Sequence, residues 1–207
     1  MVISTARMKR IVAKICETDP KFATIVASHP LCTIGRNSLA VSHFESLVES
    51  VVSQQLAMRA AETIHGRLVD LANGKITPKS ISKLAESQLR SAGLSGAKTK
   101  TIHGLSHASL SGAVEIDDLH LMEDHLVAEK LTSLWGIGPW TVDMFMMSQL
   151  GRLDIWPTGD LGVRRGWEKI HGLKEEIEPK KLQRRGDKFR PHRSIVAWYC
   201  WRALEKK

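Results

Sequence analysis

A glycine pair and a single carboxylate stand out in the segment from residue 131 to residue 166. Gly-Ile-Gly at 136–138 lies between two apolar runs, and Asp160 follows Trp140 by 20 positions. Two glycines permit a tight turn and let the backbone approach a ligand without interference from Cβ atoms. Because the amides of such a turn and of the helix after it point outward together, their natural partner is a phosphate. An ordinary turn between two helices is the alternative interpretation.

The carboxylate of Asp160 has a chemical and a structural interpretation. Breaking an N-glycosidic bond builds positive charge on the sugar. A carboxylate aimed at that sugar stabilises the charge, and it can orient or deprotonate a water molecule. Asp160 is predicted to begin a helix that runs through Arg165 and Ile170, and this position favours the ionised side chain. The structural alternative is a plain N-cap, and the two roles are compatible.

Helical signals dominate the elements that must position these residues, so the sequence predicts an all-α fold. Ser42 and Glu45 fit a capping box that opens a long helix with apolar residues at 3/4 spacing. This helix is expected to break near residues 53–55 and to end at Asn73-Gly74. Further helices are predicted over 78 onward, 98–108, 126–134, 139–150, 160–170 and from about Pro191 to the C-terminus. The charged region 174–190 is predicted to be exposed.

Composition narrows the class of protein. The chain has 207 residues, 43% of them hydrophobic, with a net charge of +8 and a pI of about 9.6. This predicts a folded basic protein, for which a polyanionic partner is common. The three cysteines form no CxxC pair and the nine histidines show no ligand spacing, so no catalytic metal is expected. No apolar run approaches the ~18 residues of a membrane span.

Three motifs together resemble one known family. Leu131-x-x-Leu134-x-Gly-Ile-Gly-Pro-Trp-Thr141, followed by Gly-Asp-Leu-Gly-Val-Arg-Arg at 159–165, is similar to the helix-hairpin-helix DNA glycosylase superfamily. The most similar branch is the 3-methyladenine DNA glycosylase II type, which excises alkylated purines. Val-Val-Ser-Gln-Gln-Leu at 51–56 resembles the helix of this family that faces the minor groove. Residues 189–201 resemble its closing helix.

The resemblance implies a fold and a set of site residues. The expected architecture is one glycosylase domain over 1–207, made of two helical lobes with a cleft between them and a hairpin motif at about 126–150. Asp160 is then the catalytic carboxylate. The base pocket falls on Trp140, Trp201 and Met144, and the wedge that fills the gap left by the flipped base falls on Gln55 with Gln54. The phosphate clamp falls on Gly136, Ile137, Gly138 and Thr141. Arg193 and Arg164 are expected to orient Asp160 or to contact DNA.

Several of these residues keep a second interpretation. Trp201 is either a pocket wall or a core residue of an amphipathic last helix. Gln55 is either the wedge or a polar residue at a helix kink. The basic residues between 180 and 190, together with Lys98 and Lys100, either follow DNA or form a solvated charged surface. The first sixteen residues, which contain no acid, are either a transit peptide or the first basic helix.

The expected activity follows from the tryptophan at position 140. Bifunctional relatives, which also nick DNA through a Schiff base, have a lysine there. Without an amine nucleophile the reaction is expected to end at an abasic site. The indole instead favours a cationic base such as 3-methyladenine or 7-methylguanine. A non-catalytic binder of abasic or distorted DNA, and a helical scaffold that grips DNA only through the hairpin, are the alternatives.

The remaining expectations concern the binding partner, cofactors, cellular location and oligomeric state. The partner is double-stranded DNA with alkylated bases or abasic sites, flipped out for reaction. No membrane association and no organic cofactor are expected, although the resemblance implies that hairpin carbonyls hold a monovalent cation. The free thiols predict an intracellular protein, in the nucleoid-containing cytoplasm of a bacterium or in a eukaryotic nucleus. A monomer is the simplest expectation.

Overall fold

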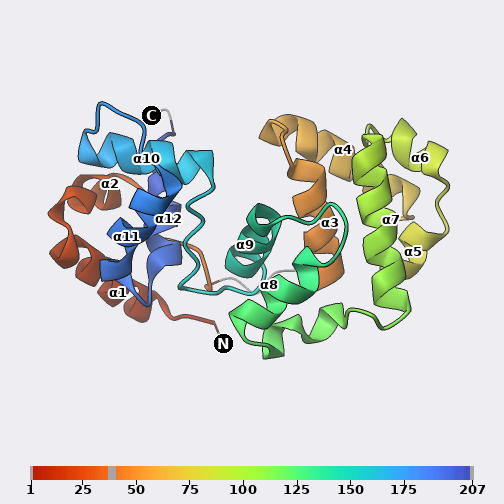
Figure 1. The fold of residues 1–207 in the computed structure, drawn as a ribbon, viewed down its shortest axis with the longest axis horizontal. Coiled ribbons are helices and arrows are strands. Elements are labelled where there is room, and N and C mark those ends of the chain that lie inside the picture. The colour runs from red at the N-terminus through yellow and green to blue at the C-terminus, as the bar shows by residue number, and fades with distance from the viewer. Residues whose placement is uncertain (1, 37–40, 206–207) are drawn as a thin grey trace. The chain divides into compact units, whose positions relative to one another are not determined.

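The computed structural model describes residues 2–36 and 41–205. Within these ranges every regular element is a helix, as Figure 1 shows, which confirms the predicted all-α class. The chain forms two compact units, which are described separately: unit 1 comprises Met1–Ser38 and Met146–Lys207, and unit 2 comprises Leu39–Phe145. Among the described residues, no helix combines the length and apolar character that crossing a membrane requires.

Unit 2 is built around α3, whose apolar stripe is fully buried. Phe44, Leu47, Val48, Val51 and Val52 are all at most 2% exposed, as the 3/4 spacing predicts. The helix packs against α4, α7 and the 3₁₀ helix η2. The elements of this unit are α3 (His43–Ser53), α4 (Met58–Leu71), α5 (Pro78–Ser82), α6 (Glu86–Ser91), α7 (Gly96–Leu110), η2 (Ile116–Leu121), α8 (Asp124–Thr132) and α9 (Pro139–Ser148), of which the last three residues belong to unit 1.

The predicted start of α3, the break before α4, the end of α4 and the start of α5 are confirmed and have local causes. The helices predicted over 98–108, 126–134 and 139–150 span 96–110, 124–132 and 139–148 instead. The Ser42 hydroxyl accepts the Glu45 amide at the start of α3. Thr77 caps α5, with Pro78 in the first helical position. The expected break of the long helix falls between α3 and α4, at residues 54–57. Asn73 and Gly74 both take left-handed φ angles just after α4 and end it.

Unit 1 joins the N-terminal helices to the C-terminal third of the chain. Its basic first helix confirms one of the two interpretations of the N-terminus. The core gathers Phe22, Trp156, Trp167 and Phe189 in edge-to-face ring contacts between 5.6 and 6.1 Å. The elements are α1 (Thr5–Thr18), η1 (Pro20–Phe22), α2 (Ala23–Ser28), α10 (Leu161–His171), α11 (Pro179–Gly186), η3 (Asp187–Phe189) and α12 (Arg193–Arg202).

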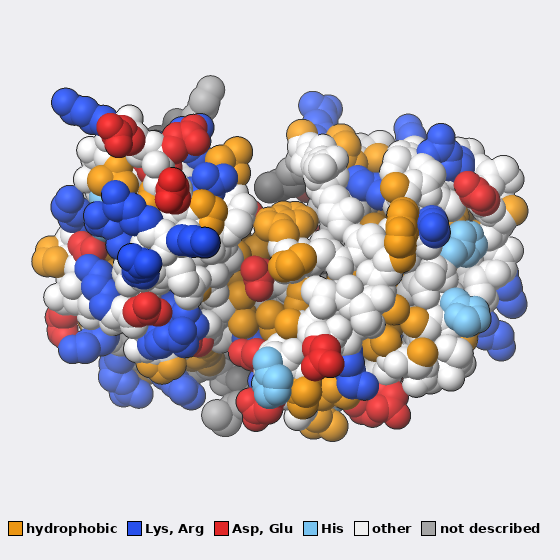
Figure 2. Space-filling model, in the orientation of Figure 1, with side chains coloured by type: hydrophobic (Ala, Val, Ile, Leu, Met, Phe, Trp, Pro, Cys, Tyr) orange, Lys and Arg blue, Asp and Glu red, His pale blue; other side chains and the backbone are white. Residues whose placement is uncertain are grey.

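The charged region 174–190 contains regular structure as well as exposed charges. It contains α11 and η3, and its apolar residues Ile177, Leu182 and Phe189 are buried. The basic side chains of α11 are exposed between them, and Figure 2 shows Lys and Arg side chains gathered on this part of unit 1. The prediction of an exposed segment is therefore confirmed for its charged residues, while three widely spaced apolar residues anchor it to the core.

Helices α10 and α12 approach each other more closely than ordinary side chains permit. A Cβ atom at Gly166 would lie 1.9 Å from the carbonyl oxygen of Cys200. Gly162, one turn earlier on the same face of α10, is adjacent to Trp201 in the same way. The two glycines thus bring the C-terminal half of α12 against the start of α10, where Asp160 lies.

A buried charge cluster closes unit 1 at the other end of α10. The Asp19 carboxylate is 3.0 Å from His171 Nε2 and 2.9 Å from Lys188 Nζ. Burial alone would raise the pKa of Asp19, but hydrogen bonds from His171, Lys188 and the Lys21 amide outweigh it and lower the pKa to about 2. His171 also stacks on Trp167, with 4.0 Å between ring centroids.

Asp19→Asn is expected to destabilise the protein by about 2 kcal/mol at pH 7, the free energy that corresponds to the lowered pKa. An acid whose pKa is lower in the folded state stabilises it above its ordinary pKa of 3.8 and loses that contribution as the pH falls toward 2. Urea titrations between pH 6 and pH 3 measure the difference. The wild type and the variant should converge as the pH falls, and a gap that stays constant would contradict the assigned ion pairs.

Candidate active site

The candidate residues divide between the two units. Asp160, Trp201, Arg164 and Arg193 belong to unit 1. The wedge, hairpin, Trp140 and Met144 belong to unit 2. Each group is therefore built up within its own unit.

Asp160 is the N-cap of α10, as the sequence predicts. Its Oδ1 atom accepts the Val163 amide at 2.7 Å. The same oxygen accepts the indole Nε1–H of Trp201 at 2.9 Å. Asp160 is half-buried. Its carboxylate is held by a donor from its own helix and by a donor from α12. The catalytic role of Asp160 stays a prediction.

Trp201 fits neither of its two interpretations completely. It is half-buried, whereas the preceding residues of α12 from Arg193 to Cys200 are buried. Its hydrogen bond to Asp160 spans 41 positions of sequence and was not predicted. The Gly162 position explains how the ring comes so near, since a Cβ there would lie 2.9 Å from Trp201 Cδ1 and 3.0 Å from Asp160 Oδ1. Gly162, two positions after Asp160, is the feature of the sequence that could have indicated the contact with Trp201.

The carboxylate of Asp160 also acts on a neighbouring thiol. Burial raises the pKa of Cys200, and the negative charge of Asp160 raises it further. Cys200 is therefore a protonated core residue and no nucleophile.

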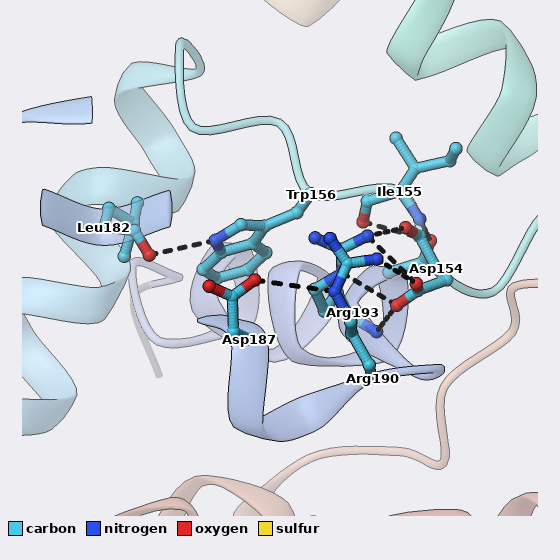
Figure 3. A network of polar contacts seen from close by, with 8 residues as sticks. Asp154, Ile155, Trp156, Leu182, Asp187, Arg190 and Arg193 are labelled. Carbon is cyan, nitrogen blue, oxygen red and sulfur yellow. Dashed lines mark hydrogen bonds and ion pairs between the residues drawn. The ribbon is translucent and has the colours of Figure 1, made fainter. Parts of the chain in front are cut away.

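Arg193 does not orient Asp160, and this expectation is wrong. Its buried guanidinium binds Asp154 instead, with Nε 2.8 Å from Oδ1 and an Nη2 atom 2.9 Å from Oδ2 (Figure 3). Arg190 adds a second cation to the same carboxylate. An Arg–carboxylate pair with two parallel bonds is geometrically strict. Arg193 thus clamps the irregular segment before Asp160 to the start of α12, and it is not available for a phosphate.

Three more hydrogen bonds hold the same segment. The Ser194 amide donates to the Leu153 carbonyl, and the Ser194 hydroxyl accepts the Ile155 amide. The Trp156 indole donates to the Leu182 carbonyl of α11, as Figure 3 shows. Together with the Trp201 bond, these contacts attach the segment 153–160 to both ends of α12.

The glycine hairpin of unit 2 is shaped by contact with α7. Gly136 has φ +81°, and a Cβ there would lie 1.9 Å from Thr101 Oγ1. Ile137 is buried, and its amide donates to the Leu134 carbonyl. The expectation that Ile137 contributes to a phosphate clamp is therefore wrong for its amide. Gly138 and the first turn of α9 remain as the part of the hairpin where helix amides lack intrahelical partners.

Gln54 and Thr141 have structural roles that the sequence did not reveal. The Gln54 side-chain nitrogen donates to Thr141 Oγ1 at 2.9 Å and to the Gly136 carbonyl at 3.2 Å. Thr141 is only 2% exposed. Gln54 is thus a brace between the α3–α4 turn and the hairpin and not a wedge, and the buried Thr141 hydroxyl is not a phosphate ligand. The monovalent cation at the hairpin stays a prediction.

Gln55 occupies an exposed, strained turn. It has φ +56°, a conformation that costs an L-residue about 1–2 kcal/mol. Lys98 of α7 holds this turn, with Nζ 2.8 Å from the Val52 carbonyl and 2.7 Å from the Gln54 carbonyl. These two hydrogen bonds place the Lys98 ammonium against the turn, and burial there lowers the pKa of Lys98. The next residue, Leu56, is 40% exposed and was missed because a single leucine carries no signal.

Trp140 and Met144 lie one turn apart on α9, and both are half-buried. Residues at i and i+4 share a helix face, so the two side chains are neighbours. Among the described residues, no group of three His, Cys, Asp or Glu side chains is placed to hold a metal ion.

The cations of unit 1 are partly committed to intramolecular pairs. Arg165 binds Glu176 and lies 3.6 Å from Glu168. Lys188 and Arg190 pair with Asp19 and Asp154. Arg164 is half-buried on α10, and its DNA contact stays a prediction.

Comparison with known proteins places these observations in one family. Residues 48–191 match the profile described as HhH-GPD superfamily base excision DNA repair protein. The DNA-3-methyladenine glycosylase 1 of Schizosaccharomyces pombe is 30% identical over 162 residues, which cover 77% of this chain and 71% of the relative.

Solved structures show the same fold. A DNA-3-methyladenine glycosidase from Bacillus halodurans has a TM-score of 0.79 and 33% identity, covering 93% of this chain and 88% of its own. A 3-methyladenine DNA glycosylase from Schizosaccharomyces pombe, in complex with abasic DNA, has a TM-score of 0.79 and 27% identity, covering 94% of each chain. The chain therefore belongs to the HhH-GPD superfamily of base excision DNA repair proteins.

Proposed function

We propose that this protein is a DNA glycosylase that hydrolyses the N-glycosidic bond of alkylated purines in double-stranded DNA. The names of its relatives, and the abasic DNA bound to one of them, support this substrate class. The observation that carries the proposal is the Asp160 carboxylate, held at the start of α10 by donors from two helices.

Asp160 stabilises the transition state through its charge. Positive charge develops on the deoxyribose as the bond to the base breaks. The Asp160 carboxylate attracts this charge and orients or deprotonates the attacking water. An alkylated purine such as 3-methyladenine or 7-methylguanine is itself cationic and leaves readily, so the protein needs to be only a moderate catalyst.

Trp140 limits the reaction to base removal. It stands in the motif where bifunctional relatives carry the lysine that forms a Schiff base. Without that amine no imine forms with the sugar, and the product is an intact strand with an abasic site. The indole face attracts a cationic base by about 0.5–2 kcal/mol. In unit 2, Trp140 and Met144 are assigned to the lesion base. The pocket-wall role of Trp201 in unit 1 stays a prediction.

Gln55 is assigned as the wedge that replaces the flipped base. It is exposed on a turn that Lys98 and Gln54 hold rigid, so a side chain at its tip enters the duplex without reordering the backbone. The exposed Leu56 beside it supplies the apolar surface that a glutamine lacks.

A base-release assay tests the proposal. The protein is incubated with methylated duplex DNA, the freed bases are separated by chromatography, and the strand is examined before and after alkali. We expect free 3-methyladenine and 7-methylguanine, nicking only after alkali, and no covalent adduct with borohydride. Binding to abasic-site DNA without base release would instead indicate a non-catalytic binder, and a trapped adduct would contradict the monofunctional assignment.

A further inference from the structure

Trp135 is an exposed aromatic residue at the edge of the glycine hairpin. It directly precedes Gly136, and 54% of its surface is accessible to solvent. A scattered exposed leucine is ordinary in a folded protein, but tryptophan carries the largest apolar surface of any side chain. An exposed tryptophan next to a candidate ligand-binding turn therefore calls for a partner.

Lys100 lies over the face of this ring. Its Nζ atom is 4.3 Å from the ring centroid of Trp135, and the side chain is exposed. Such a contact is worth only about 0.5–1 kcal/mol at an exposed site, too little to account for leaving an indole in water. It does hold an ammonium and an indole together as one preformed amphipathic surface. We call Trp135 and Lys100 the Trp–Lys pair.

The Trp–Lys pair is held by the scaffold that fixes the hairpin. Lys98 of α7 donates to the α3–α4 turn, and Thr101 of α7 touches the position where Gly136 lacks a Cβ. Lys100 lies between these two anchors on the same helix. One rigid element thus sets the positions of the hairpin, the Gln55 turn and the lysine of the pair.

We propose that the Trp–Lys pair binds the DNA backbone beside the phosphate gripped by the hairpin. The inference rests on the proposed DNA-binding function. A nucleotide backbone alternates an anionic phosphate with an apolar deoxyribose, which is the chemistry that an ammonium next to an indole matches. Lysine has three donors, and contact with a ring face occupies none of them as a hydrogen bond, so Nζ also donates to a phosphate oxygen. The contact ignores base sequence.

Continuity and charge favour DNA over a protein partner. The pair is adjacent in sequence to Gly136, so a duplex held by the hairpin amides passes directly over it. A single cation on an indole is by itself small for a protein interface, which needs on the order of 800 Å² from each partner.

Equilibrium binding to a duplex with a tetrahydrofuran abasic-site analogue, measured over a range of salt concentrations, tests the inference. Lys100→Gln should lower the slope of log Kd against log salt by about 0.9, the value for one lost phosphate contact. Trp135→Ala should weaken binding by about fivefold at one salt concentration and leave the slope nearly unchanged.

Matched variants exclude general effects of losing an exposed side chain or a charge. Leu110→Ala removes a residue that is also 54% exposed, at the opposite end of α7, and Lys79→Gln removes an exposed cation of the same unit. Both should bind like the wild type. Wild-type affinity and slope in Trp135→Ala and Lys100→Gln would overturn the inference and assign the pair to another partner. A wild type that binds but releases no base would overturn the proposed function while leaving this contact intact.

Discussion

Asp160→Asn is expected to lower the single-turnover rate of base release by at least about 100-fold, while the protein stays folded and binds abasic-site DNA. The substitution removes the negative charge and keeps an oxygen acceptor at Oδ1. An asparagine Oδ1 still accepts the Val163 amide and the Trp201 indole, so the cap of α10 and its link to α12 survive. The loss then measures the contribution of a carboxylate to the developing sugar cation.

Two comparisons separate this electrostatic effect from structural ones. Asp160→Ala also removes the cap and should cost about 1 kcal/mol of stability, which Asp160→Asn should not. Asp19→Asn neutralises another capping carboxylate of unit 1, at the opposite end of α10. It should lose stability at pH 7 and keep its rate of base release at 25 °C. Wild-type release by Asp160→Asn would remove Asp160 from the catalytic role.

The elements of this fold could be predicted because their signals are local. The stripe on α3, the prolines at 78 and 139, and Asn73-Gly74 each act within a few residues of their own position. The N-cap at Asp160 is of the same kind. None of these depends on which helix packs against which, and single-sequence patterns suffice for them.

The errors concern side chains whose partners are distant in sequence. Arg193 was expected near Asp160, but its partner Asp154 lies 39 positions away. Gln54 and Thr141 are 87 positions apart and satisfy each other inside unit 2. A polar residue next to a motif looks the same in sequence whether it faces a ligand or braces the turn behind it. The three-dimensional structure is needed to distinguish a ligand-facing side chain from a bracing one, because burial determines which polar groups must hydrogen-bond within the protein.

The close approach of α10 and α12 is accompanied by a recognisable sequence pattern. Gly162 and Gly166 are spaced by four residues, which places both on one face of a helix that begins at Asp160. Glycine is costly inside a helix, so a pair at this spacing indicates a neighbour too near for side chains. The identity of the neighbour, at Cys200 and Trp201, required the structure.

Gly166→Ala is accordingly expected to destabilise the protein by about 3 kcal/mol or more, near the upper end of overpacking effects. Its Cβ would lie 1.9 Å from the carbonyl oxygen of Cys200 and 2.4 Å from the carbonyl carbon. These are backbone atoms of α12, so the clash is not relieved by rotating a side chain. Gly104→Ala, at an exposed position of α7 where a Cβ meets nothing within 4 Å, should instead stabilise the protein by up to about 1 kcal/mol. Urea unfolding of both variants measures the contrast.

Gly162→Ala distinguishes packing of the two helices from positioning of the acid. Its Cβ would meet the Trp201 ring at 2.9–3.1 Å, and a side chain can turn away where a backbone cannot. The loss of unfolding free energy should therefore be smaller than for Gly166→Ala. Because the displaced indole no longer donates to Asp160, the rate of base release should nevertheless fall, and this fall should be the larger of the two effects when both are expressed as free energies. Equal stability losses at 162 and 166, with base release unchanged at 162, would show that the glycines serve packing alone and that the Trp201 bond does not position the carboxylate.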